Sequence, residues 1–185
     1  MLKDLDLRLL RWMRTRGHAP EAEHAMRSLG AAAEWGAIWA AIGLVAAGID
    51  RERRERWLRA ATVGPASIGV NFLVKLAVGR PRPDLGRRLP PLAGAPSALS
   101  FPSAHATSSL AAATAMGRVA PGARLPLYSL AALVCLTRPY LGMHYPSDVL
   151  GGVALGLVLG SAVPGLRPPD AEERLIDLVA AAGPA

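Results

Sequence analysis

The chain has 185 residues with a formal net charge of +7; half of its residues are hydrophobic and few are aromatic. Its mean hydropathy is +0.27, and charged blocks separate long uncharged runs, which is typical of a multi-span membrane protein rather than a soluble domain. The basic residues lie at the ends of apolar runs, where they would meet lipid headgroups. We therefore predict a membrane partner and no nucleic-acid partner. The single cysteine, Cys135, excludes disulfides within the chain and a cysteine-based metal site.

Residues 1–19 are predicted to form an N-terminal amphipathic helix. One helical face carries apolar side chains, namely Leu2, Leu5, Leu9 and Trp12, while Lys and Arg residues occupy the others. Such a helix is typical of a membrane interface, and a surface helix packed on the protein is an equally good interpretation. Gly17 and His18 end it.

Residues 20–164 are predicted to form one membrane-embedded domain, an all-α bundle with about five spans. The spans that the apolar runs indicate are 20–49, 60–78, 103–119, 125–137 and 146–163. The charged segment 50–59 is too polar to enter a bilayer, and residues 80–102, rich in Pro, Gly and Arg, are predicted as a long loop. Residues 165–185 are predicted as a C-terminal tail.

Several positions within the spans suggest packing roles. Asn71 is expected to face the protein interior, and Glu34 to lie near the headgroup end of the first span, where it snorkels or meets an interfacial partner. Gly152, Gly156 and Gly160 recur at four-residue intervals. This row of small residues predicts that another helix approaches the last span closely.

The alternation of spans brings scattered polar residues to one face of the bilayer. A residue that ends one span and a residue that begins the next lie at the same face, because the loop that joins them does not cross the bilayer, and two further crossings return the chain to that face. The residues concerned are Lys75, His105, Arg138, His144 and Asp148. The sequence therefore predicts one polar site.

The cations of this site indicate a compact polyanion, and phosphate is the common one. Arg82 and Arg138 offer planar forks that match phosphate oxygens, and Lys75 adds a point charge. Ser103 stands at a predicted helix start, where its hydroxyl and the free backbone N–H groups of the first turn can hold another oxygen.

Two histidines allow a divided mechanism, in which one attacks phosphorus and the other protonates the leaving oxygen. His144 and Asp148 are four positions apart, and a helix that opens at Pro146 places the carboxylate near the imidazole. A carboxylate bound to one ring nitrogen fixes the tautomer and frees the other nitrogen.

Two other interpretations of these residues stay open. Two histidines and Asp148 could hold a metal, although three nearby cations would repel it and Asp84 is the one other acid near the predicted site. Alternatively, His105 and His144 could simply cap helices. We predict that no metal is bound.

Three segments, in this order, carry the polar residues: Lys75-(six residues)-Arg82-Pro83, Pro102-Ser103-Ala104-His105 and Arg138-(five residues)-His144-(three residues)-Asp148. They resemble the three-part signature of the type 2 phosphatidic acid phosphatase superfamily, which includes membrane lipid phosphatases and soluble vanadium haloperoxidases. The chain departs from the usual pattern with Ala104 in place of Gly and Thr137 in place of Ser. Ala104 keeps its backbone N–H, but its methyl group narrows the approach to phosphate.

The resemblance implies the fold of this family, a role for each residue, and no cofactor. His144 would be the nucleophile, Asp148 would orient it, and His105 would be the general acid. The phosphate-binding residues would be Lys75, Arg82, Ser103, the N–H of Ala104, and Arg138. The implied enzyme is a phosphoric monoester hydrolase that acts on a lipid phosphate. Its implied location is the cell membrane, as a multi-pass protein.

The amino-acid sequence around the second and third segments is similar to that of short actinobacterial members of this family. It implies a polyprenyl-phosphate sugar phosphate of the decaprenylphosphoryl-5-phosphoribose type, in cell-wall precursor synthesis, as the substrate. Undecaprenyl diphosphate, phosphatidylglycerophosphate and phosphatidic acid are the alternatives. A haloperoxidase would bind vanadate at the same residues, but those relatives are larger and soluble. A silent membrane scaffold would have no use for the complete set.

Overall fold

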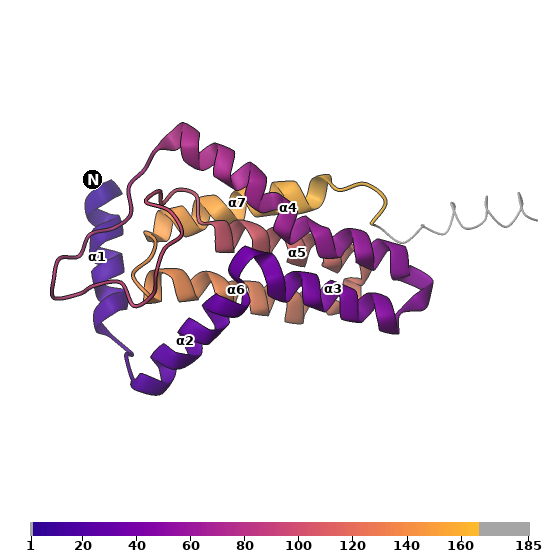
Figure 1. The fold of residues 1–185 in the computed structure, drawn as a ribbon, viewed down its shortest axis with the longest axis horizontal. Helices are drawn as coiled ribbons and strands as arrows, with labels where there is room; N and C mark the ends of the chain where they lie inside the picture. The colour runs from indigo at the N-terminus through magenta and orange to yellow at the C-terminus, as the bar shows by residue number, and fades with distance from the viewer. Residues whose placement is uncertain (1, 167–185) are drawn as a thin grey trace, which may run out of the picture.

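The computed structural model describes residues 2–166, and these form an all-helical structure (Figure 1). Its helices are α1 (Leu2–Thr15), α2 (Pro20–Ala32), α3 (Ala37–Ile49), α4 (Arg54–Val78), α5 (Ala104–Val119), α6 (Arg124–Tyr140) and α7 (Pro146–Ala162), with short 3-10 turns η1 (Glu34–Gly36), η2 (Arg51–Arg53) and η3 (Pro121–Ala123). The predicted all-α class is confirmed. The long loop predicted between the second and third spans is also present. The predicted C-terminal tail falls outside the described residues from position 167 onward.

Helix α5 is the centre of the bundle, and α3, α4, α6 and α7 all contact it. Nearly all of its side chains are buried, and most are Ala, Ser or Thr, which lets the neighbours come close. The tightest approach is by α7: a Cβ on Gly152 would lie 2.6 Å from the carbonyl oxygen of Ser103, and one on Gly156 would lie 2.5 Å from that of Thr107. The predicted close helix contact is therefore confirmed.

The first predicted span is one helix in the sequence pattern but two helices in the structure. α2 and the segment Glu34–Ile49 meet at a bend of 50°. Trp35 and Gly36 have φ angles of 54° and 75°, in the left-handed region, so the α-helical hydrogen bonding stops there. Gly36 packs against α4, since a Cβ on it would lie 2.9 Å from the backbone nitrogen of Pro65. The prediction of a continuous helix was wrong because helical periodicity does not reveal this tertiary contact.

The described helices differ in how well they could cross a bilayer. Arg51–Val78 is long and apolar enough to do so alone, and the bent pair of α2 with Glu34–Ile49 would be a second span; α7 is apolar but has 17 residues. The outer faces of the bundle carry exposed large apolar side chains, among them Leu44, Val45, Leu73, Leu76, Leu133, Leu136, Leu150 and Val158. Exposed apolar surface of this extent is typical of contact with a membrane.

Helix α1 lies across one end of the bundle (Figure 1). Its inner side buries Asp6, Leu10 and Arg14, whereas Leu5, Leu9 and Trp12 remain exposed. Both interpretations of this helix therefore hold in part: it packs on the protein through one face and leaves an apolar face outward. Asn71, predicted to face the interior, is fully buried and donates hydrogen bonds to the carbonyl of Pro102 and the hydroxyl of Thr107.

The α5–α7 contact predicts a stability effect. Gly156→Ala places a methyl group against the backbone of α5, and we expect it to lower the free energy of unfolding by about 1–3 kcal/mol, the range for overpacked cores. Gly69→Ala is the matched control, because a Cβ at this exposed position of α4 meets nothing within 4 Å. Thermal unfolding in detergent, followed by circular dichroism, measures both. Equal stability of the two variants would contradict the packing account.

Candidate active site

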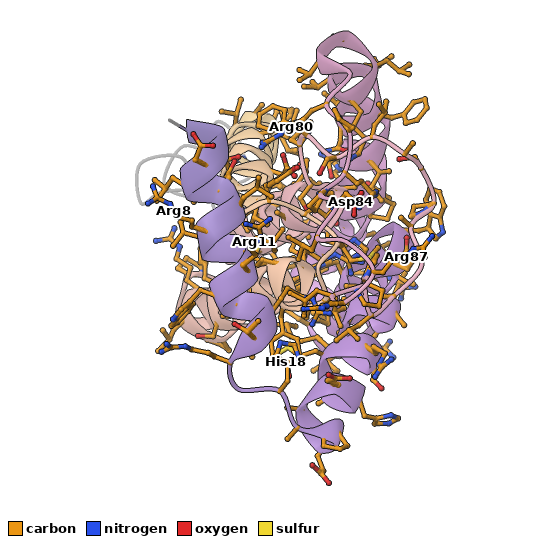
Figure 2. All side chains as sticks on the ribbon, turned by 90° about the vertical axis from the view of Figure 1, so that its left-hand side faces the viewer. Arg8, Arg11, His18, Arg80, Asp84 and Arg87 are labelled. Atoms are coloured by element: carbon orange, nitrogen blue, oxygen red, sulfur yellow. The ribbon has the colours of Figure 1, made fainter. Side chains whose placement is uncertain are left out.

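The predicted site residues meet at one end of the bundle, where α4 and α6 end and α5 and α7 begin. The loop between α4 and α5 covers this end beside α1 (Figures 1 and 2). The backbone N–H of Ser103 donates to the carbonyl of Asp148 at 2.9 Å, which ties the starts of α5 and α7 together. Six polar site residues are buried, namely Lys75, Ser103, His105, Arg138, His144 and Asp148.

The hydrogen bonds of His144 identify its tautomer. Nη1 of Arg82 lies 3.1 Å from Nε2 of His144. Because a guanidinium only donates, Nε2 must accept, and the ring hydrogen is on Nδ1. Nδ1 lies 3.6 Å from Oδ2 of Asp148, too long for a direct hydrogen bond, and 3.4 Å from the hydroxyl of Ser100. The arrangement leaves a lone pair on Nε2.

The surroundings of His144 keep the imidazole neutral. Burial lowers its pKa to about 4; the carboxylate of Asp148 opposes this, and the positive charges of Arg82, Arg138 and Lys75 lower it further. An imidazole with this pKa is uncharged at pH 7, and its Nε2 becomes protonated only when the pH falls toward 4. His144 can therefore act as a nucleophile over the physiological range.

The carboxylate of Asp148 is completely buried and bonded on both oxygens. Oδ2 accepts the backbone N–H of Tyr145 at 2.8 Å and the hydroxyl of Ser100, and Oδ1 accepts Nη1 of Arg80 at 2.8 Å. Charge-assisted bonds of this kind stabilise the ionised form. Asp148 is thus a fixed anion beside His144.

The three predicted cations differ in how fully they are bonded. Lys75 donates to the carbonyls of Leu99 and Ser100, and Arg82 donates to those of Ser97 and Met143. By contrast, two buried polar atoms of the site, Nε of Arg138 and Oγ of Ser103, have no hydrogen-bond partner among the described residues.

Buried polar groups are normally hydrogen-bonded, so these two atoms suit an anionic ligand. The first intrahelical bond of α5 runs from the N–H of Thr107 to the carbonyl of Ser103. The preceding N–H groups, including that of Ala104, therefore lie outside the helical ladder and add to an anion site.

His105 lies on the side of the site formed by the bend between α2 and α3. Its Nε2 is 3.0 Å from the carbonyl of Gly30 and 3.5 Å from Oε2 of Glu34. Glu34 thus has a partner, as the sequence analysis suggested, and that partner is His105, the predicted general acid. A cavity of about 110 Å³ opens beside His105 and Lys75; its lining is mainly apolar and includes Trp35, Ile68 and Phe72.

Exposed arginines surround this end of the molecule. Figure 2 shows Arg8 and Arg11 on α1 and Arg87 in the loop, and all three are exposed. A basic surface around a buried anion site attracts negatively charged lipid headgroups.

The sequence analysis missed three contributors to the site. Ser100 and Arg80 bond Asp148, and Asp6 bonds Arg80. Arg80 stands two positions before Arg82 in an Arg-Pro-Arg-Pro run, which is a signal that could have placed both at the site. No local spacing points to Ser100 or to Asp6, whose partner is 74 positions away.

Comparisons with known proteins agree with this geometry. The family model described as PAP2 superfamily matches residues 56–169. Decaprenylphosphoryl-5-phosphoribose phosphatase of Mycobacterium tuberculosis is 44% identical over 128 residues, 68% of this chain and 69% of the relative. Undecaprenyl-diphosphatase of Bacillus subtilis is 32% identical over 111 residues, 60% of this chain and 58% of the relative.

One solved structure has the same fold. A crystal structure of a transmembrane PAP2 type phosphatidylglycerolphosphate phosphatase from Bacillus subtilis aligns with a TM-score of 0.67 and 21% identity. The alignment covers 96% of this chain and 87% of the other. At this identity the likeness shows the fold alone.

The unpartnered atoms of the site predict anion binding. Arg138→Lys removes a planar fork and its Nε, so we expect inorganic phosphate to bind about 10-fold more weakly, the loss of one charge-assisted hydrogen bond. Isothermal titration of the detergent-solubilised protein measures the affinity. Arg124→Lys, at the opposite end of α6, is the control and is expected to bind like the unaltered chain. Equal affinities of the two variants would contradict a phosphate contact by Arg138.

Proposed function

The chain belongs to the PAP2 superfamily, and from this premise we propose that it is a metal-independent integral-membrane phosphatase that hydrolyses a lipid-linked phosphate. One observation carries the proposal. A neutral His144, with the lone pair of Nε2 facing Arg82, lies among cations and unpartnered donors suited to a phosphate group. We place the protein in the cell membrane as a multi-pass protein, with its active site at the headgroup level.

The first chemical step forms a bond between Nε2 of His144 and phosphorus. Arg82 must leave Nε2 for this, and the phosphate oxygens give its guanidinium a better partner than a neutral ring nitrogen. As the N–P bond forms, the bond from phosphorus to the leaving oxygen breaks, and its electron pair stays on that oxygen. The charge on the equatorial oxygens is stabilised by Arg82, Arg138 and Lys75.

His105 exchanges the proton with the leaving group. Its Nε2 faces the carbonyl of Gly30, which only accepts, so Nε2 carries a hydrogen. The other ring nitrogen, Nδ1, also carries a hydrogen when His105 is in its imidazolium form; it donates that proton to the leaving oxygen, and the ring becomes neutral. In the second step a water attacks phosphorus, Nδ1 takes its proton, and the N–P bond breaks to release phosphate and restore His144.

The substrate we propose is a polyprenyl-phosphate sugar phosphate of the decaprenylphosphoryl-5-phosphoribose type, in cell-wall precursor synthesis. The mycobacterial relative supports this class. The apolar cavity beside His105 is consistent with a leaving group that remains attached to a lipid. Undecaprenyl diphosphate is the second candidate, supported by the relative from Bacillus subtilis, and phosphatidylglycerophosphate and phosphatidic acid complete the panel.

Phosphate release in excess chelator tests the proposal. Purified protein in detergent is expected to release phosphate from at least one of these four lipids with EDTA present, because protein cations replace the metal. His144→Ala is expected to reduce release by at least 1,000-fold, since no nucleophile remains. Release that requires added metal, or that survives in His144→Ala, would contradict the mechanism.

The leaving group separates the role of His105 from that of His144. We expect His105→Ala to reduce kcat about 100-fold or more on a lipid phosphate, in the range of general acid catalysis, but less than 10-fold on p-nitrophenyl phosphate, whose leaving group needs no proton. His144→Ala is expected to lose both activities. Equal losses on the two substrates in His105→Ala would argue against proton donation by this residue.

A further inference from the structure

Asp6, on the N-terminal helix α1, is bonded to the residues that hold the catalytic carboxylate. Its Oδ2 accepts Nη2 of Arg80 at 2.8 Å and the hydroxyl of Ser147, and its Oδ1 accepts the backbone N–H of Ser147 at 3.1 Å. Asp6 is 8% exposed, although it lies on an otherwise largely exposed helix. A buried carboxylate needs partners to offset its lost hydration, and Asp6 finds them in Arg80 and Ser147, both far away in the sequence.

Arg80 links Asp6 to Asp148. One arm of its guanidinium, Nη1, donates to Oδ1 of Asp148 at 2.8 Å and to the hydroxyl of Ser147 at 2.7 Å, while the other arm donates to Asp6. Its planar group lies 4.1 Å from the centre of the Tyr145 ring. Figure 2 shows Arg80 beside the N-terminal half of α1. Only a planar fork can meet both carboxylates in this way.

The residues that Arg80 contacts besides Asp6 lie at the start of α7: Ser147 and Asp148 are in its first turn, and Tyr145 precedes it. Asp148 lies near His144, and the backbone N–H of Tyr145 also binds Asp148. If Asp6 lost its charge, Arg80 would keep one carboxylate partner instead of two, and the N–H and hydroxyl of Ser147 would face one accepting oxygen in place of two. Through Arg80, α1 is thus connected to one of the three donors that hold the Asp148 carboxylate, the others being Ser100 and the backbone of Tyr145.

We propose that Asp6 and Arg80 are positioning residues of the active site, through which α1 sets the orientation of Asp148 and so of the nucleophile His144. The proposal rests on the proposed function for its effect on turnover. It makes α1 a support of the active site that acts through Arg80 and Asp148. Helix α1 presents Leu5, Leu9 and Trp12 outward. The helix that offers this apolar face to the lipid is then also the one that positions Asp148 and His144.

Kinetics of five variants test this inference on the lipid that the unaltered enzyme hydrolyses. We expect Asp6→Asn to lower kcat at least 10-fold with little change in KM, because the phosphate contacts of Lys75 and Arg138 remain while the geometry of the nucleophile is lost. Asp6→Glu keeps the charge and is expected to restore most of the rate. Asp4→Asn, at an exposed acid of the same helix, is the matched control and is expected to leave kcat unchanged.

The other two variants, Arg80→Ala alone and Arg80→Ala combined with Asp6→Asn, ask whether Asp6 acts through Arg80. If it does, Asp6→Asn added to Arg80→Ala causes little further loss, since residues that act as a unit are not additive. Wild-type kcat in Asp6→Asn, a full additional loss in the double variant, or a parallel fall in phosphate affinity and melting temperature would overturn the inference. The last result would mean that Asp6 serves folding alone.

Hydrogen–deuterium exchange separates this inference from the proposed function, because it needs no turnover. In Asp6→Asn we expect residues 145–149 to exchange several-fold faster, while residues 104–119 of α5 exchange as in the unaltered protein. Unchanged exchange at 145–149 would overturn the inference even for an active enzyme. Inactivity of the unaltered chain on every lipid, with faster exchange at 145–149 in the variant, would instead count against the proposed function and leave the positioning network standing.

Discussion

The carboxylate of Asp148 is completely buried, and the arrangement of the residues around it meets the requirements of that burial. An ionised carboxylate is costly to remove from water unless charged or polar donors replace its hydration. Here the donors come from different parts of the chain: Ser100 from the loop after α4, the backbone of Tyr145 before α7, and Arg80, which is held in turn by α1. The requirement for these bonds brings loop, helix end and N-terminal helix to one place.

The same place gathers positive charge in excess of what its acids neutralise. Lys75 donates two of its three ammonium hydrogens to backbone carbonyls, which do not cancel its charge. Arg82 and Arg138 lie close enough to act on each other and on His144. Like charges at this distance repel. The region therefore favours a ligand with two negative charges, and a phosphate monoester supplies them together with oxygens for the unpartnered donors.

Much of the site followed from spacing, but its supporting contacts did not. Lys75, His105 and Arg138 could be placed at one level because membrane spans alternate in direction, and that rule needs no tertiary information. The bend at Trp35 depends on the contact of Gly36 with Pro65, which the hydrophobic pattern of the first span does not contain. Likewise, the bond between Asp6 and Arg80 joins a helix that sequence analysis treated as a separate segment to the loop after α4. Long-range polar contacts carry no periodicity, and they were the part that could not be predicted.

The guanidinium that caps Nε2 of His144 has a consequence for which molecules can react. If His144 is the nucleophile that we propose, Arg82 occupies its lone pair before substrate binds, and a neutral electrophile such as a carboxylic ester has no charge with which to draw Arg82 aside. A dianion would attract the guanidinium of Arg82 as it binds, and Nε2 of His144 would then be free to react. Substrate discrimination is then built into the ground state: the reactive atom becomes available only to those compounds that carry the group it is meant to attack.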